Sequence, residues 1–131
     1  MSWGASALRL TDFYGDGKHM VLSTISGTDD AALPAFKAAA EQLRAQGIFG
    51  IDGSLENGGL CSKAVANAIQ AATGIVPYGY QWSADEVRDI AARADWSFSV
   101  DPEVNGAEGA KLSAKAFFDV CVEQNLGIGF D

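Results

Sequence analysis

The chain has 131 residues, of which 48% are hydrophobic and 10% are aromatic. This length and composition predict a single globular domain, residues 1–131, whose core needs no disulfide or metal framework. Nine basic residues against seventeen acidic ones give a net charge of −8. That charge argues against binding to nucleic acid or to an anionic membrane surface, and it fits a basic partner or simple solubility better. The partner we expect is a peptide or a protein.

The first half of the chain predicts a β-hairpin followed by a helix. Two strand-like runs flank Gly15-Asp16-Gly17, whose glycines supply the positive φ of a tight turn. A helix is expected near 30–46, where apolar residues recur at helical spacing before Gly47. The run IFGID (48–52) predicts a short buried strand. Polar residues at 52–57 resemble a fragment of a calcium loop, but the full ligand spacing is missing, so we expect a solvated loop.

The second half predicts three more helices. They are expected near 60–73, ended by Gly74, near 84–94, and near 111–124. Ser83 and Glu86 have capping-box spacing at the start of the second of these. The alternating run WSFSVD (96–101) predicts a strand, and LGIGFD (126–131) predicts a short final one. The fold class is therefore α+β, or mixed α/β, with a small sheet and about four helices packed on it.

The two cysteines are Cys61 and Cys121, and neither belongs to a CxxC pair. With a single histidine in the chain, this spacing predicts no zinc site, and no motif predicts another metal or a cofactor. Cys121 lies among apolar residues of the last helix and is expected to be a buried, inert thiol. The N-terminus shows no basic segment before a long apolar stretch. We therefore expect a cytoplasmic protein, or one exported without a recognisable signal peptide.

Cys61 follows two glycines and begins the predicted helix 60–73. A helix N-terminus stabilises a thiolate, and its free N–H groups can bind an oxyanion, so Cys61 is a candidate nucleophile. The alternative is core packing, since cysteine is often buried and Cys61 falls on the apolar face of that helix. Both interpretations stay open on the sequence alone.

The stretch from Cys61 to Gln81 resembles the nucleophile helix of NlpC/P60-type cysteine peptidases, which have a papain-like fold. The matching features are the Cys61-Ser62 pair, a small apolar helix, an exit containing Gly74, Ile75 and Pro77, and Gln81. The family's catalytic histidine follows the cysteine, whereas the only histidine here, His19, precedes it. The resemblance therefore implies a circularly permuted member, with Cys61 as the nucleophile and His19 as the base.

A second resemblance covers the N-terminal part of the chain. The segment DFYGDG followed by GTDDAALPAFKAAAEQL is similar to the start of pectate-lyase-like phage tailspikes. That family folds as a right-handed β-helix, which needs many short, regularly spaced strands. The rest of this chain is too short and too helical for such a fold, so the match is one of local turn and helix chemistry.

Tyr78, Tyr80 and Trp82 alternate after Pro77, and they are candidates for lining a substrate groove or for forming an edge strand with one buried face. Two functional hypotheses remain. The first is a thiol hydrolase or amidase that acts on a peptide or cell-wall peptide through Cys61 and His19. The second is a non-catalytic acidic interaction protein, of the immunity, inhibitor or phage-related kind, that binds a protein partner.

Overall fold

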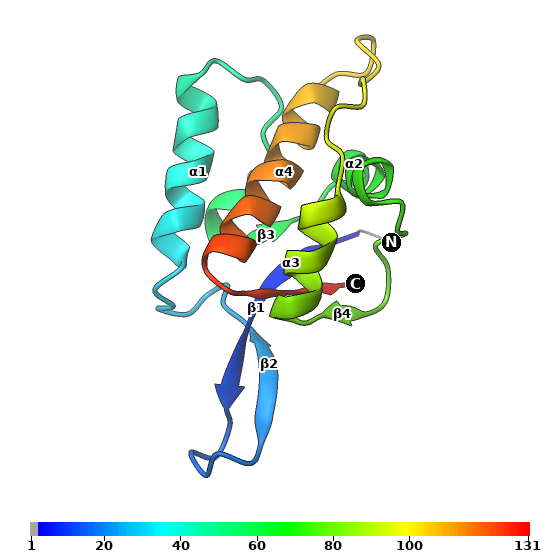
Figure 1. The fold of residues 1–131 in the computed structure, drawn as a ribbon. Helices are drawn as coiled ribbons and strands as arrows, with labels where there is room; N and C mark the ends of the chain where they lie inside the picture. Colours follow the sequence, from blue (N-terminus) through cyan, green and yellow to red (C-terminus); the bar gives the residue numbers. More distant parts are fainter. Residues whose placement is uncertain (1–2) are drawn as a thin grey trace.

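An antiparallel sheet lies along one side of the fold in the computed structural model, which describes residues 3–131 (Figure 1). Its order is β2-β1-β5-β4, and β3 pairs with β1 beside β2. Within residues 3–131 the five strands are β1 (Ala5–Asp12), β2 (Met20–Thr24), β3 (Gly59–Leu60), β4 (Gln81–Trp82) and β5 (Gly127–Phe130). The final strand and the N-terminal hairpin predicted from the sequence are confirmed.

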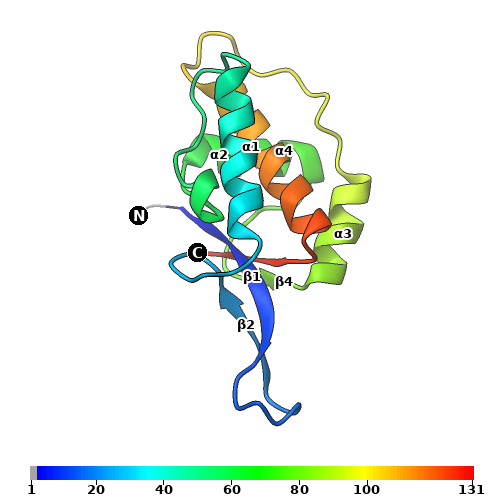
Figure 2. The ribbon, with the colours of Figure 1, turned by 90° about the vertical axis from the view of Figure 1, so that its left-hand side faces the viewer.

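Four α-helices cover one face of this sheet over the same residues, and the opposite face carries none (Figures 1 and 2). The helix α4 lies centrally and packs against each of the other three. The helices are α1 (Leu33–Ala45), α2 (Lys63–Thr73), α3 (Ala84–Arg93) and α4 (Ala107–Glu123), and a 3-10 turn, η1, covers Leu55–Asn57. Sheet and helices thus form two layers, which confirms the α+β class.

The core lies between the sheet and α4. Strands alternate so that Ala7 and Ile128 point toward the helices, where Phe117, Phe118 and Cys121 of α4 meet them. Burial raises the pKa of the Cys121 thiol far above its ordinary value, because the thiolate would lose its hydration. The prediction of a buried Cys121 is confirmed.

Capping residues set the helix boundaries much as the sequence predicts. The hydroxyl of Ser62 accepts a hydrogen bond from the Val65 N–H at the start of α2, and Gly74 ends α2 with a left-handed backbone. Ser83 and Glu86 form the predicted capping box at the start of α3. The last helix begins at Ala107, four residues before the predicted start.

Two predicted strands are wrong. Residues 48–52 form an irregular loop with bends at Phe49 and Gly50, and residues 96–101 do not pair with the sheet. The alternation of 96–101 reflects side-chain burial, because Trp96 and Phe98 pack against the core while the serine that follows each of them is exposed. An alternating sequence pattern indicates that one side of a segment is buried, but it does not show that the segment pairs with another strand.

The hairpin of β1 and β2 extends well beyond the helical layer (Figures 1 and 2). The strand β5 pairs with β1 only over Ala5–Leu8, and β3 pairs only with Ala5 and Ser6. From Arg9 onward β1 therefore has β2 as its single neighbour in the described structure. We call this two-stranded extension, residues 9–24, the arm.

Candidate functional site

Cys61 lies between β3 and the N-cap of α2, and its side chain is exposed. It is therefore neither in the core nor inside the helix, where the sequence placed it. Its backbone N–H donates to Asp52 Oδ2 at 2.9 Å, and its thiol lies 3.5 Å from Asp52 Oδ1. The N–H that would serve an oxyanion is thus occupied by a carboxylate of the same chain.

Asp52 holds the segment around Cys61 in place through hydrogen bonds. Its carboxylate is buried and accepts hydrogen bonds from the N–H groups of Cys61 and Ser54, while its own N–H donates to Ser113 of α4. Asp52 therefore joins the turn before η1 to the start of α2 through its carboxylate, and to α4 through its backbone N–H. The expectation of a solvated loop at 52–57 is wrong for Asp52, whose burial was hidden in a run of polar residues.

His19 lies at the far end of the arm and is exposed. Its Nδ1 is 2.6 Å from Asp16 Oδ2, and its ring packs edge-on against Tyr14. Hydrogen bonds from the Lys18 N–H, and from the His19 ring and N–H, lower the pKa of the Asp16 carboxyl. These contacts stabilise the turn and orient the imidazole toward an acid three residues before it in the sequence.

The structure does not bring Cys61 and His19 together. Leu60, beside Cys61, pairs with Ala5 at the start of β1, whereas Met20, beside His19, pairs with Asp12 at its end. Seven residues of extended strand separate these two pairs, which corresponds to about 23 Å. A nucleophile and its base need to approach within about 3 Å, or to share one water.

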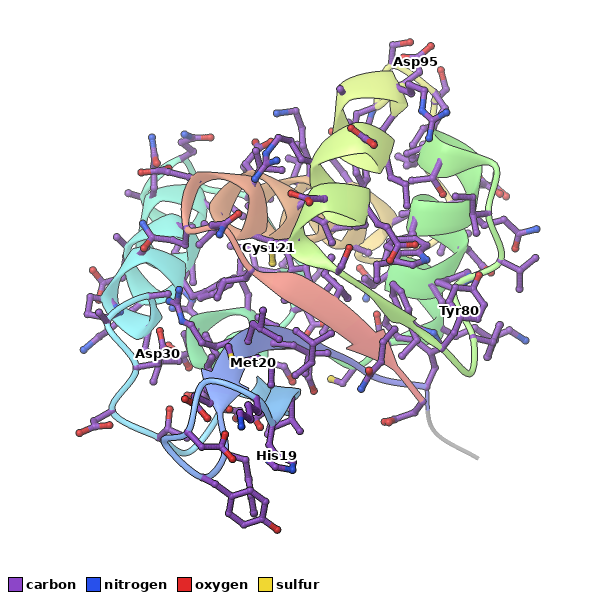
Figure 3. All side chains as sticks on the ribbon, turned by 60° about the horizontal axis from the view of Figure 1, so that its bottom comes forward. His19, Met20, Asp30, Tyr80, Asp95 and Cys121 are labelled. Carbon is purple, nitrogen blue, oxygen red and sulfur yellow. The ribbon has the colours of Figure 1, made fainter. Side chains whose placement is uncertain are left out.

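The three aromatic residues at 78–82 separate into two environments. Trp82 is buried and packs on Phe118 and Phe130, so it belongs to the core. Tyr80 is partly exposed, and its hydroxyl donates to the Val76 carbonyl, while Tyr78 is exposed in the loop before β4. Figure 3 places Tyr80 far from His19 and Met20, at the other end of the sheet.

Tyr80 borders a shallow hollow of about 320 Å³ on the helix-free face of the sheet. Its neighbours there include Leu8, Gln81 and Gly129. A Cβ on Gly129 would lie 3.1 Å from the Leu8 side chain, so the glycine leaves room for Leu8 to lie flat over β5. Neither Cys61 nor His19 lines this hollow.

Within residues 3–131 no group of three or more histidine, cysteine or acidic side chains is arranged to hold a metal ion. Over the same range, no helix is both long and apolar enough to cross a membrane.

The largest feature that the sequence did not reveal is apolar exposure on the arm. Five large apolar side chains there are between 38% and 69% exposed: Leu10, Phe13, Tyr14, Met20 and Val21. They account for half of the large apolar residues that are exposed in the described part of the chain. The sequence predicted the hairpin but not that it would extend beyond the sheet. The signal that could have indicated this is the presence of large apolar residues on both sides of the turn, close to its tip.

The base of the arm is held to the body by one ion pair. The Arg9 guanidinium donates to both carboxylate oxygens of Asp30, at 2.8 and 2.9 Å, just before α1. These hydrogen bonds hold the pKa of Asp30 below its usual value, and Asp30 also accepts the Ala32 N–H. The arm therefore leaves the body in a defined direction.

Comparison with known proteins gives no match: no family model, no curated protein and no solved structure is detectably similar to this chain.

Proposed function

We propose that this protein is a non-catalytic, acidic protein-binding module that docks on its partner through the arm. The observation that carries the proposal is the exposure of five large apolar side chains on a hairpin that extends from the body. The strand register places Leu10 and Met20 on one face of this hairpin, and exposed apolar patches on a small domain are typical of interaction sites.

Energetics supports the same proposal. A two-stranded hairpin alone is at best marginally stable in water, because it has no layer to bury its faces. Phe13 and Tyr14 at the tip contact each other and His19, so most of their surface remains in water. Each 100 Å² of apolar surface that a partner buries contributes about 2.5 kcal/mol before the costs of association.

Charge indicates what surrounds the apolar contact. The molecule carries a net charge of −8, whereas β2 carries no charged residue. A contact made by the uncharged part of the arm would satisfy both features, because the acidic surfaces around it would then suppress wrong partners.

The hydrolase hypothesis has less support. It requires Cys61 and His19 within reach of one another, and they lie at opposite ends of β1. It also requires a free N–H for the oxyanion, and the Cys61 N–H is bonded to Asp52.

Site-specific photo-crosslinking tests the proposal. A benzophenone amino acid would replace Tyr14 on the arm or, as the control, Lys37, which is exposed on α1. We expect a discrete protein adduct from position 14, its loss when Phe13→Ser is added, and none from position 37. The purified adduct protein should then bind the wild-type chain at least tenfold more tightly than the Phe13→Ser variant. Equal labelling at both positions, or none at position 14, would contradict docking through the arm.

A further inference from the structure

The outer edge of β2 presents backbone groups that nothing in residues 3–131 pairs. The Phe13 N–H donates to the His19 carbonyl, and the Ile25 N–H donates to the Ala7 carbonyl. Because hydrogen-bonded pairs alternate along an antiparallel ladder, His19, Val21, Ser23 and Ile25 point their backbone groups toward β1. Met20, Leu22 and Thr24 therefore point their N–H and C=O groups outward, away from the sheet.

This edge lacks the features that usually keep sheet edges apart. Natural edge strands carry lysine, proline or a bulge, or they lie under a helix or loop. The sequence of β2 is MVLST, without charge or proline, and its register with β1 continues without a bulge from Met20 to Thr24. The strand also lies below the helical layer, so no helix covers it (Figures 1 and 2).

We propose that the partner of this edge is a second copy of the chain, whose β2 pairs antiparallel with the first about a two-fold axis at Leu22. This inference rests on the proposed function, since it assigns an occupant to the arm. In this register Leu22 faces Leu22 of the second copy, and Met20 faces its Thr24. Every outward donor of one copy then meets an outward acceptor of the other.

Side chains agree with this register. Leu10 lies directly opposite Leu22 within one copy, so the pairing continues this row as Leu22 and Leu10 of the second copy across one sheet face. No charged residue of β2 faces another one, because the strand has none. The antiparallel direction also carries each tip, with Phe13 and Tyr14, toward the base of the other arm, where those rings gain a protein surface.

The first measurement is the mass of the purified full chain by sedimentation equilibrium up to about 100 µM. We expect a monomer–dimer equilibrium for the wild type. Leu22→Pro removes one outward N–H without breaking a bond to β1, and it should weaken dimerisation at least tenfold. Leu22→Ala, the matched control, keeps that N–H and should weaken dimerisation less. Unchanged far-UV and near-UV circular dichroism would show that the variants fold.

The second measurement tests the register. In a Cys61→Ser background, Leu22→Cys places two thiols on the two-fold axis, where directly opposite strand residues have Cα atoms about 5.5 Å apart, suitable for a disulfide. Mild oxidation should link this variant into a dimer much faster than the Val21→Cys control, whose residue would face Ser23 of the second copy. This comparison does not depend on the proline variant folding.

A wild-type chain that remains monomeric at 100 µM, or equal oxidation rates for the two cysteine variants, would overturn self-pairing. Neither result would contradict the proposed function, which is tested by crosslinking from position 14. An adduct of twice the chain's mass there supports the second copy, and an adduct with a different protein as the sole product contradicts it while leaving arm docking intact.

Discussion

Replacing Phe13 by alanine should cost little folding stability, although the same change in the core is severe. Phe13 is 66% exposed, so about a third of its surface is buried, whereas Phe36 of α1 is fully buried against Phe117. Complete burial of such a side chain contributes about 1.5–3 kcal/mol. A third of that is about 0.5–1 kcal/mol, and truncation at the open tip leaves no enclosed cavity. Phe36→Ala loses the whole transfer energy and opens a cavity, for about 3–5 kcal/mol.

Thermal unfolding monitored by calorimetry measures the contrast between Phe13→Ala and Phe36→Ala. For a domain of this size, 1 kcal/mol corresponds to a Tm change of about 3–5 °C. We expect Phe13→Ala to lower Tm by no more than about 5 °C, and Phe36→Ala to lower it by 10 °C or more. If the two variants lost similar stability, the arm would be folded onto the body. Its apolar residues would then be structural, and the proposed docking role would lose its basis.

Three further predictions concern the thiols, the ion pair at the base of the arm and one glycine. Iodoacetamide should modify Cys61 in the native protein and leave the buried Cys121 unmodified. The His19→Ala variant should be modified at Cys61 at the same rate as the wild type. A clearly slower reaction at Cys61 in that variant would restore the hydrolase hypothesis. Asp30→Asn should destabilise the fold by about 1 kcal/mol at pH 7. Because folding lowers the pKa of Asp30, its contribution is present above the unfolded pKa of about 3.9, and urea titrations should show the difference from wild type vanishing as pH falls through the lower folded value. By helix propensity alone, Gly109→Ala should stabilise α4. It should instead lower the urea midpoint, because its Cβ would lie 2.1 Å from the backbone oxygen of Phe49 in the loop after α1.

Local signals in the sequence predicted most of the secondary structure. Ser83 with Glu86, and Gly74, act within a few residues of themselves, so the helix ends they set do not depend on the rest of the fold. The strand β3 could not be predicted in this way, and β4, an edge strand with Trp82 buried, was expected only as one of two alternatives for residues 78–82. Each has two residues and exists only because a distant segment pairs with it, Ala5 for Leu60 and Ile128 for Trp82.

The candidate site was less predictable for the same reason. The position of Cys61 depends on Asp52, which is nine residues away and gives no local pattern. The separation of Cys61 from His19 follows from strand register, which a single sequence does not specify. Exposure of Phe13 and Tyr14 depends on where β5 stops pairing with β1, at Leu8, and that limit is set by the lengths of two segments at opposite ends of the chain.

The distribution of charge and apolar surface explains how one chain can stay dispersed and still present a specific contact. A net charge of −8 makes two copies repel at long range, but this repulsion decays within about 8 Å at physiological ionic strength. The arm carries the uncharged strand β2 away from the acidic body, so two edges can meet while the bodies remain apart. Contacts between the two bodies would instead bring acidic surfaces together, and their repulsion would oppose the contact. Charge repulsion therefore disfavours contacts between the bodies. The contact between the two β2 edges remains, and backbone hydrogen bonds and apolar burial stabilise it.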